Sequence, residues 1–297
     1  MGYSEWSDAA YRRVSGERAG AASKEIFRGT GSIDPLMDPR KITVREARDS
    51  EHHPASVPIV VAFDVTGSMG DIPTRFARDL LGALMRRLVE QAWIADPQLL
   101  FAAVGDAVSD RAPLQVGQFE SGLEMDMWLT RLWLEGGGGD APESYLLAHW
   151  FAAGHTATDA WEKRRKKGYL FTIGDAPDKP LTPAQIQRVF GRTTELDTGQ
   201  AAVIGRAAER WELFHVHVAR GKAPHAPTLK AWSGLVGDRV LVLDQTDAIC
   251  ELIGVTMGLK EGRLTDDEAR GLLVAAGMAE EAAVAAITGV RSPNPGD

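Results

Sequence analysis

The feature that most constrains the fold is the alternation of short apolar segments with longer amphipathic segments between residues 57 and 260. Short apolar runs predict buried strands, and the longer amphipathic segments predict the helices that connect them. The segments in question cover residues 58–63, 74–93, 98–104, 114–119, 121–134, 144–153, 168–173, 183–190, 212–219, 228–236, 239–243 and 246–259. Strands that alternate with helices need crossover connections, so we expect a doubly wound, Rossmann-like α/β fold with a mostly parallel sheet.

Two flanking segments differ from this pattern. Residues 1–56 mix charged residues, Gly and Ser with few large apolar side chains, so we expect a partly irregular N-terminal arm. Residues 261–297 hold two short Ala- and Glu-rich stretches and a Ser-Pro-Asn-Pro-Gly tail. They predict a small C-terminal helical appendage that adds little to the main core, which would occupy residues 57–260. Thr182 and Thr265 are each followed three residues later by Gln or Glu, which predicts a capping box at two helix starts.

Charge and cysteine content restrict the classes of function. The 297 residues include 41 acidic and 33 basic ones, for a formal net charge of −8, which argues against binding to nucleic acid backbones. The single cysteine, Cys250, excludes an intrachain disulfide and a Cys-rich zinc site. The chain has no basic head followed by an apolar run and no uninterrupted apolar stretch of about 18 residues, so we expect a cytoplasmic protein without membrane contact.

Oxygen-bearing side chains follow the first strand of the main segment. Asp64, Thr66 and Ser68 are spaced two residues apart in a loop that also contains Gly67 and Gly70. A tight loop of this kind can direct three oxygen ligands to one point, which suits a hard divalent cation. The alternative is that Asp64 or Thr66 only caps the helix that follows.

Two further acidic segments adjoin predicted strands or helices. Four consecutive glycines, residues 136–139, lead into Asp140 and Glu143 at the start of a predicted helix. Asp175 follows the apolar strand at residues 168–173. The alternatives are a helix cap for the first pair and an ordinary strand-to-turn boundary for Asp175. Because the carboxyl ends of parallel strands meet at one edge of a sheet, we expect these acids to converge.

The combination resembles the von Willebrand factor type A (vWA) domain family over roughly residues 57–260. The metal-ion-dependent adhesion site (MIDAS) of that family uses an Asp-x-Ser-x-Ser loop, a residue from a Gly-rich loop and an Asp after the fourth strand. Thr66 stands in place of the first Ser and keeps the hydroxyl. The Asp-Ala-Pro-Glu run resembles integrin β-type A domains, which makes Glu143 the preferred fourth ligand and Asp140 a supporting or neighbouring-site candidate.

The resemblance implies a sheet order of 3-2-1-4-5-6 and metal-dependent protein binding rather than catalysis. Mg²⁺, or Mn²⁺ or Ca²⁺, would be held by Asp64, Thr66, Ser68, Glu143 and Asp175, and a partner carboxylate would complete its shell. Bacterial cytoplasmic proteins of this family often work with AAA+ ATPases of the MoxR type, so such an ATPase is the expected class of partner.

A second interpretation uses some of the same residues. Haloacid-dehalogenase-type phosphatases also place a nucleophilic Asp after an apolar strand, and Asp64, Lys167 and Asp175 match part of that pattern. The general acid that this chemistry needs two residues after the nucleophile is absent, because Thr66 stands there. His215 and His217 alternate along one predicted strand, and we expect them to be packed sheet residues rather than metal ligands.

Overall fold

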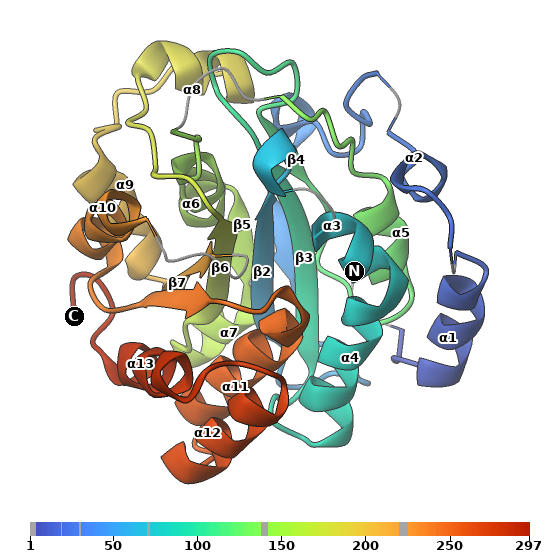
Figure 1. Ribbon diagram of the computed structural model, residues 1–297. Helices are drawn as coiled ribbons and strands as arrows, with labels where there is room; N and C mark the ends of the chain where they lie inside the picture. The colour runs from blue at the N-terminus through green and yellow to red at the C-terminus, as the bar shows by residue number, and fades with distance from the viewer. Residues whose placement is uncertain (1–3, 19, 30, 70–71, 138–141, 220–224) are drawn as a thin grey trace.

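The computed structural model describes residues 4–18, 20–29, 31–69, 72–137, 142–219 and 225–297 (Figure 1). Within them, a six-stranded sheet has the strand order β4-β3-β2-β6-β7-β8. Its strands are β2 (Val57–Asp64), β3 (Pro97–Val104), β4 (Leu114–Val116), β6 (Gly168–Gly174), β7 (Trp211–Val218) and β8 (Val240–Leu243). Every pairing is parallel except that of β4 with β3. Counted within the sheet this order is 3-2-1-4-5-6, so the predicted doubly wound α/β topology is confirmed.

Strand β2 lies at the centre of the sheet and is buried along its whole length. It pairs with β3 on one side, where Ile59 meets Leu99, and with β6 on the other, where Ile59 meets Tyr169. Ile59, Val61 and Phe63 belong to the core on one face of the sheet, and Val60 and Ala62 to the core on the other. This alternation explains the continuous apolar run in the sequence, because a strand covered on both faces needs apolar side chains in both directions.

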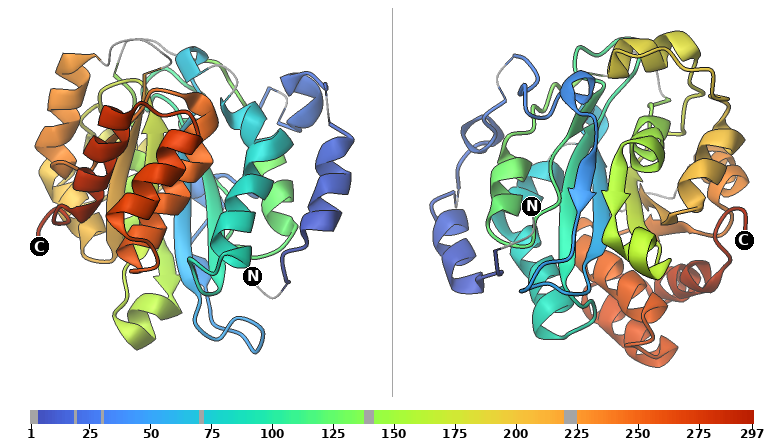
Figure 2. Two further views of the ribbon diagram at one scale, coloured as in Figure 1. Left: turned by 60° about the horizontal axis from the view of Figure 1, so that its bottom comes forward. Right: turned by 180° about the vertical axis from the view of Figure 1, so that it is seen from behind.

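Helices cover both faces (Figures 1 and 2). The core on the face of Ile59 contains residues of α3 (Ile72–Arg75), α4 (Leu81–Met85), α5 (Glu124–Thr130) and α11 (Ile249–Lys260). The opposite core contains residues of α6 (Leu146–Gly154), α8 (Pro183–Phe190), α9 (Gln200–Ala208) and α10 (Ala226–Val236). Shorter elements join them: the 3-10 turns η2 (Gly67–Met69) and η5 (Thr246–Ala248), the π-helical η3 (Phe76–Leu80) and η4 (Arg86–Glu90), and α7 (Asp159–Arg164).

The N-terminal segment packs along the outside of these layers. It forms α1 (Asp8–Gly16), α2 (Ser23–Ile26), the 3-10 turn η1 (Pro39–Lys41) and β1 (Arg45–Ala47). Tyr11 of α1 is buried, and its ring lies so close to Gly82 that a Cβ there would be 2.6 Å from it. Strand β1 pairs in parallel with β5 (Thr156–Thr158) in a separate two-stranded sheet.

The C-terminal segment is more deeply integrated than the sequence indicates. It forms α12 (Asp266–Ala275) and α13 (Glu280–Arg291), and Leu273, Ile287 and Val290 belong to the same core as α11. The side chain of Asn294 is buried and bonds the backbone of Ala208, Trp211 and Leu213. The expectation that this segment adds little to the main core is therefore wrong.

Both predicted capping boxes are present. Thr182 begins α8 and Thr265 begins α12, each with its hydroxyl accepting from the amide three residues on. Helix α9 was not among the predicted segments. In the described part of the chain, no helix is both long enough and apolar enough to cross a membrane.

Candidate metal centre

Two of the predicted acids lie at the ends of neighbouring strands. Asp64 is the last residue of β2, and Asp175 directly follows β6. In the registers of the sheet, Asp64 lies opposite Val104 of β3, and Phe63 lies opposite Ile173 of β6. The topology therefore brings the carboxyl ends of β2, β3 and β6 together at one edge, where doubly wound sheets bind ligands.

Asp64 is fully buried, and both of its carboxylate oxygens accept hydrogen bonds. Oδ1 accepts from the backbone N–H of Thr66 at 2.8 Å and from its hydroxyl at 2.5 Å. Oδ2 accepts from the hydroxyl of Tyr145 at 2.6 Å. Burial raises the pKa of Asp64 to about 6, although the hydrogen bonds from Thr66 and Tyr145 oppose the shift, and the nearby charge of Asp175 adds to it.

Glu143 is also buried, and its backbone is fixed to the loop that follows β6. Its N–H donates to the carbonyl of Pro177 at 3.0 Å, and its own carbonyl accepts from the N–H of Lys179 at 2.9 Å. Its Oε2 is buried and has no hydrogen-bond partner among the described residues. Burial and the charges of Asp64, Asp110 and Asp106 raise the pKa of Glu143 to about 8.

An unpartnered buried carboxylate oxygen among other acids fits a cation, because a cation would satisfy the oxygen and offset the repulsion. The donor set is all oxygen, which suits Mg²⁺, Mn²⁺ or Ca²⁺ better than softer metals. The residues present therefore fit the group that the resemblance implies.

Two acids of the cluster, Asp106 and Asp110, were not among the predicted site residues. Asp106 follows β3, and its Oδ1 forms a salt bridge of 3.0 Å with Lys179. Asp110 accepts from the N–H of Asp106 at 2.9 Å. The signal was present, since the strand at residues 98–104 is followed by Gly105 and Asp106 just as β6 ends in Gly174 before Asp175.

The Gly-rich segment approaches this cluster closely. A Cβ at Gly137 would lie 2.1 Å from Oδ1 of Asp110, and one at Gly105 would lie 2.3 Å from Oδ2. The carbonyl of Gly137 also accepts from the N–H of Gly67 at 3.2 Å. Gly105 and Gly137 therefore need to be glycine, because the backbone comes so close to Asp110. The hydrogen bond between Gly67 and Gly137 joins the loop after β2 to the segment before Glu143.

The remaining predicted ligands are placed only in part. Thr66 is buried beside Asp64, and Ser68 lies in the turn η2, where its side chain is outside the description. Asp140 lies outside the described residues. Among the residues that the structure does describe, no three His, Cys, Asp or Glu side chains are already arranged to hold a metal ion. The full ligand set thus stays a prediction.

Two lesser predictions can be checked directly. His215 is buried, stacks on Trp232 with ring centroids 3.6 Å apart, and shares a hydrogen bond of 3.0 Å with the hydroxyl of Thr172. His217 is likewise buried, and burial lowers the pKa of both imidazoles. They are packed sheet residues, as expected.

The phosphatase interpretation needs Lys167 close to Asp64. Lys167 instead precedes β6, whereas Asp64 and Asp175 lie at the other end of the parallel strands. Its ammonium group forms a salt bridge of 2.7 Å with Asp297. The structure therefore does not bring these residues together.

The sequence matches no protein-family model and no curated protein. Similar solved structures include proximal thread matrix protein 1 from the mussel byssus with a zinc-occupied MIDAS motif, at 9% identity and a TM-score of 0.41 over 75% of this chain and 49% of that one. The pilus adhesin SpaC of Lactobacillus rhamnosus GG is 8% identical, with a TM-score of 0.45 over 77% of this chain and 31% of that one. The conserved hypothetical protein BatB of Bacteroides thetaiotaomicron is 12% identical, with a TM-score of 0.44 over 70% of this chain and 100% of that one.

The chain thus spans less than half the length of two of these proteins and the whole length of the third. The fold itself is established by the strand order, with β2 at the centre, one antiparallel edge strand and helices on both faces. This is the doubly wound, mostly parallel α/β fold that the sequence predicted.

Proposed function

We propose that this chain is a metal-dependent protein-binding module. The proposed cation site is at the carboxyl ends of β2, β3 and β6, which are neighbours in the sheet. The observation that carries the proposal is the buried Oε2 of Glu143, which has no partner among the described residues and lies within reach of the charges of Asp64, Asp106 and Asp110. The proposed ligands are Asp64, Thr66, Ser68, Glu143 and Asp175, with Asp140 in support.

The proposed cation is Mg²⁺, with Mn²⁺ or Ca²⁺ as substitutes. Carboxylates and hydroxyls are hard ligands, and Mg²⁺ usually keeps several waters in its octahedral shell. Asp64 already accepts three hydrogen bonds, so it would bind the ion through a bridging water and attract it by its negative charge. Lys179, paired with Asp106, lowers the negative charge of the cluster and so eases the approach of a further anion.

The proposed partner group is a carboxylate from another protein, which would take an open position on the ion. The hydroxyl–imidazole pair of Thr172 and His215 near Asp64 is fully buried, so we infer that binding is a simpler function for such a position than catalysis. A MoxR-type AAA+ ATPase in a bacterial cytoplasm is the class of partner that we propose, on the basis of the family resemblance.

Metal binding is tested by calorimetry and thermal unfolding of the metal-stripped protein. A ligand that binds only the folded state stabilises it by RT ln(1 + [L]/Kd), so Mg²⁺ at about 100 times Kd should add about 2.7 kcal/mol. Asp64→Asn should abolish this gain. Asp267→Asn, on the exposed start of α12, is the matched control and should respond like the parent. A parental response in Asp64→Asn would place the metal elsewhere.

Partner binding is tested with purified MoxR-type ATPase in Mg²⁺ and in EDTA. Chelation should release the partner while circular dichroism of the module stays unchanged. Glu143→Ala should weaken the complex more than Asp140→Ala does. A complex that survives EDTA unchanged would contradict the metal bridge without bearing on the fold.

A further inference from the structure

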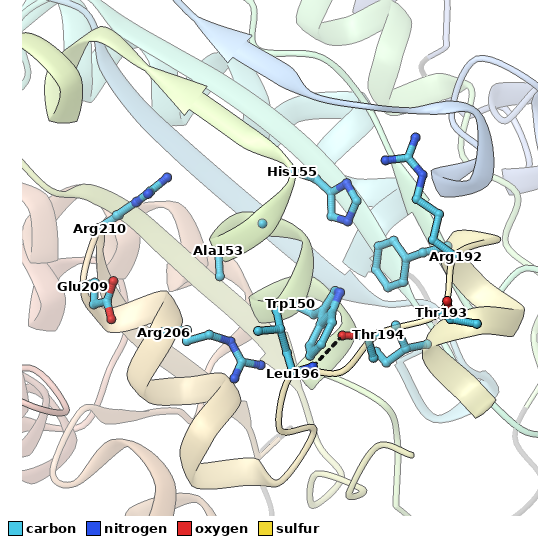
Figure 3. Close-up of a pocket in the computed structure, with 13 residues that line it drawn as sticks. Trp150, Ala153, His155, Arg192, Thr193, Thr194, Leu196, Arg206, Glu209 and Arg210 are labelled. Carbon is cyan, nitrogen blue, oxygen red and sulfur yellow. Dashed lines mark hydrogen bonds between the residues drawn. The ribbon is translucent and has the colours of Figure 1, made fainter. Parts of the chain in front are cut away.

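A second candidate site lies on the helical layer that contains α6, α8 and α9, at the opposite end of the sheet from the carboxylate cluster. A cavity of about 390 Å³ is bounded by the carboxyl ends of α6, α8 and α9 and by the loop between α8 and α9 (Figure 3). Its lining includes Arg210, which immediately precedes β7, whereas the carboxylate cluster follows the far ends of the parallel strands. The cavity is thus separate from the proposed metal centre.

One part of the lining is formed by aromatic and apolar side chains. Trp150 of α6 and Phe190 of α8 lie in it, and the imidazole of His155 stacks on Phe190 with the ring centroids 5.0 Å apart and an interplanar angle of 11°. Leu196, on the connecting loop, is 57% exposed beside them. Burial lowers the pKa of His155, so this wall is uncharged at neutral pH. Trp150 and Phe190 are themselves buried, so Leu196 and the half-buried ring of His155 present the apolar surface that suits an aromatic ring.

The rest of the lining is strongly basic. Arg192, Arg206 and Arg210 all line the cavity, and none of them forms a salt bridge within the described part of the chain. The lining contains one carboxylate, Glu209, so it carries more positive than negative charge in a protein whose formal net charge is −8. Positively charged side chains are thus concentrated at this cavity, although the protein as a whole is negatively charged.

The arginines retain hydrogen-bonding capacity. Arg206 donates to the carbonyl of Asp197 at 2.8 Å, and its guanidinium lies 4.9 Å from the ring centroid of Trp150. Arg192 donates to the hydroxyl of Thr43 at 3.4 Å. A guanidinium has five N–H donors, so each keeps several for a ligand. Positive side chains also stabilise helix carboxyl ends, but that effect does not require three of them around one apolar cavity.

We propose that this cavity binds a small organic anion with an aromatic ring. Figure 3 shows Arg192 on one side of Trp150 and Arg206 and Arg210 on the other, so a ring against the apolar wall would have guanidinium groups on either side available to its anionic group. The volume lies in the range of small-molecule sites, about 300–1,000 Å³, and the cavity is bordered by helix ends but open to solvent. Carboxylate, sulfonate or phosphate groups would be bound by charge-assisted, bidentate hydrogen bonds.

The test uses two dyes of matched shape. 8-Anilinonaphthalene-1-sulfonate is anionic, and N-phenyl-1-naphthylamine has the same rings without the charge. We expect the sulfonate to bind the intact protein at one saturable site and the neutral dye to bind at least tenfold more weakly. Arg192→Gln and Arg210→Gln, both at exposed positions, should each weaken sulfonate binding roughly tenfold, as loss of a charge-assisted hydrogen bond does.

Arg13→Gln on α1 makes the same charge change far from the cavity and should leave binding unchanged. Leu196→Asn, on the exposed loop, should weaken both dyes by removing apolar contact without affecting the circular dichroism. Equal affinity for the two dyes, or parental binding by both arginine variants, would overturn the proposal. Displacement of the sulfonate by an acidic peptide but not by 1-naphthoate would overturn the class of ligand.

Discussion

The hydroxyl of Tyr145 donates a hydrogen bond of 2.6 Å to Oδ2 of Asp64, and this bond joins two of the segments that form the candidate metal centre. Tyr145 precedes α6 and is separated from Asp64 by 81 residues in the sequence. The contact passes over Gly174 of β6, where a Cβ would lie 1.8 Å from the tyrosine oxygen. The bare backbone at Gly174 therefore allows Tyr145 to orient the carboxylate of the central strand.

Removal of this hydroxyl should destabilise the protein in a pH-dependent way. Tyr145→Phe leaves a buried carboxylate oxygen without its donor, which costs about 1.5–3 kcal/mol for a charged group. Because the pKa of Asp64 is raised to about 6, the loss should be larger at pH 8, where Asp64 is ionised, than at pH 5, where it is protonated. Urea denaturation in EDTA at the two pH values measures this difference. An equal loss at both would show that the ionised carboxylate does not depend on Tyr145.

Gly174→Ala tests the same contact from the other side. The added methyl group collides with the hydroxyl of Tyr145 and with its ring, where a Cβ would lie 2.5 Å from Cζ. Overpacking of this kind typically costs about 1–3 kcal/mol. In the double variant with Tyr145→Phe the loss should be smaller than the sum of the single losses, because the oxygen that causes the closest contact is gone. Additive losses would contradict the steric explanation.

Glu143 should make the metal-free protein less stable as the pH rises. Its pKa is raised from 4.5 to about 8 on folding, so between these values the folded state holds more protons than the unfolded state. The free energy of unfolding then falls with rising pH, by at most about 1.4 kcal/mol per pH unit for one proton. Glu143→Gln should flatten this slope in EDTA. Mg²⁺ should also flatten it in the parent, since cation and proton compete for the same carboxylate.

We also expect no Mg²⁺-dependent hydrolysis of phosphate monoesters. Thr66 occupies the position where a general acid would be needed, and Lys167 lies at the opposite end of β6. A panel of monoesters assayed with Mg²⁺ checks this expectation. Turnover that is lost in Asp64→Asn would instead support the phosphatase.

The C-terminal tail should contribute strongly to stability through Asn294. Its amide donates to the carbonyls of Ala208 and Trp211 and accepts from the N–H of Leu213 and from Arg239, at distances of 2.8–3.1 Å. Asn294→Ala leaves several buried groups unpaired, so a loss of about 2–4 kcal/mol is expected in urea denaturation. Asp297→Asn, three residues on and half exposed, is the control and should cost less than about 1 kcal/mol.

The sequence was sufficient to predict the strands of the sheet but not all of the helices that pack around it. Apolar runs such as β2 identify themselves because burial on both faces excludes polar residues. Helix α9 was not predicted because Val203 and Ile204 are the only large apolar side chains among its nine residues and it follows a polar loop. The role of the C-terminal helices was misjudged because Ala283 and Ala286 pack closely without the large side chains that usually reveal a core element.

The residues of the candidate site were likewise predicted only in part. Asp64 and Glu143 were found from motifs that lie along the chain, and their convergence follows from the parallel sheet. Tyr145 could not be found in this way, since its contact with Asp64 depends on the space above Gly174. Asp106 and Asp110 belong to no motif of the family resemblance, although their position after β3 would have sufficed.

The two neighbours of β2 also determine when the site can form during folding. Ile59 pairs with Leu99 and with Tyr169, so the three strand ends meet only after a loop of more than a hundred residues has closed. Such non-local pairing is slow compared with the formation of local helices. Neither the loop after β2 nor the segment around Glu143 can assemble the proposed site alone, so we expect a nascent chain that has not yet reached β6 to lack it. The side chains of the proposed metal centre therefore come together only when β6 pairs with β2.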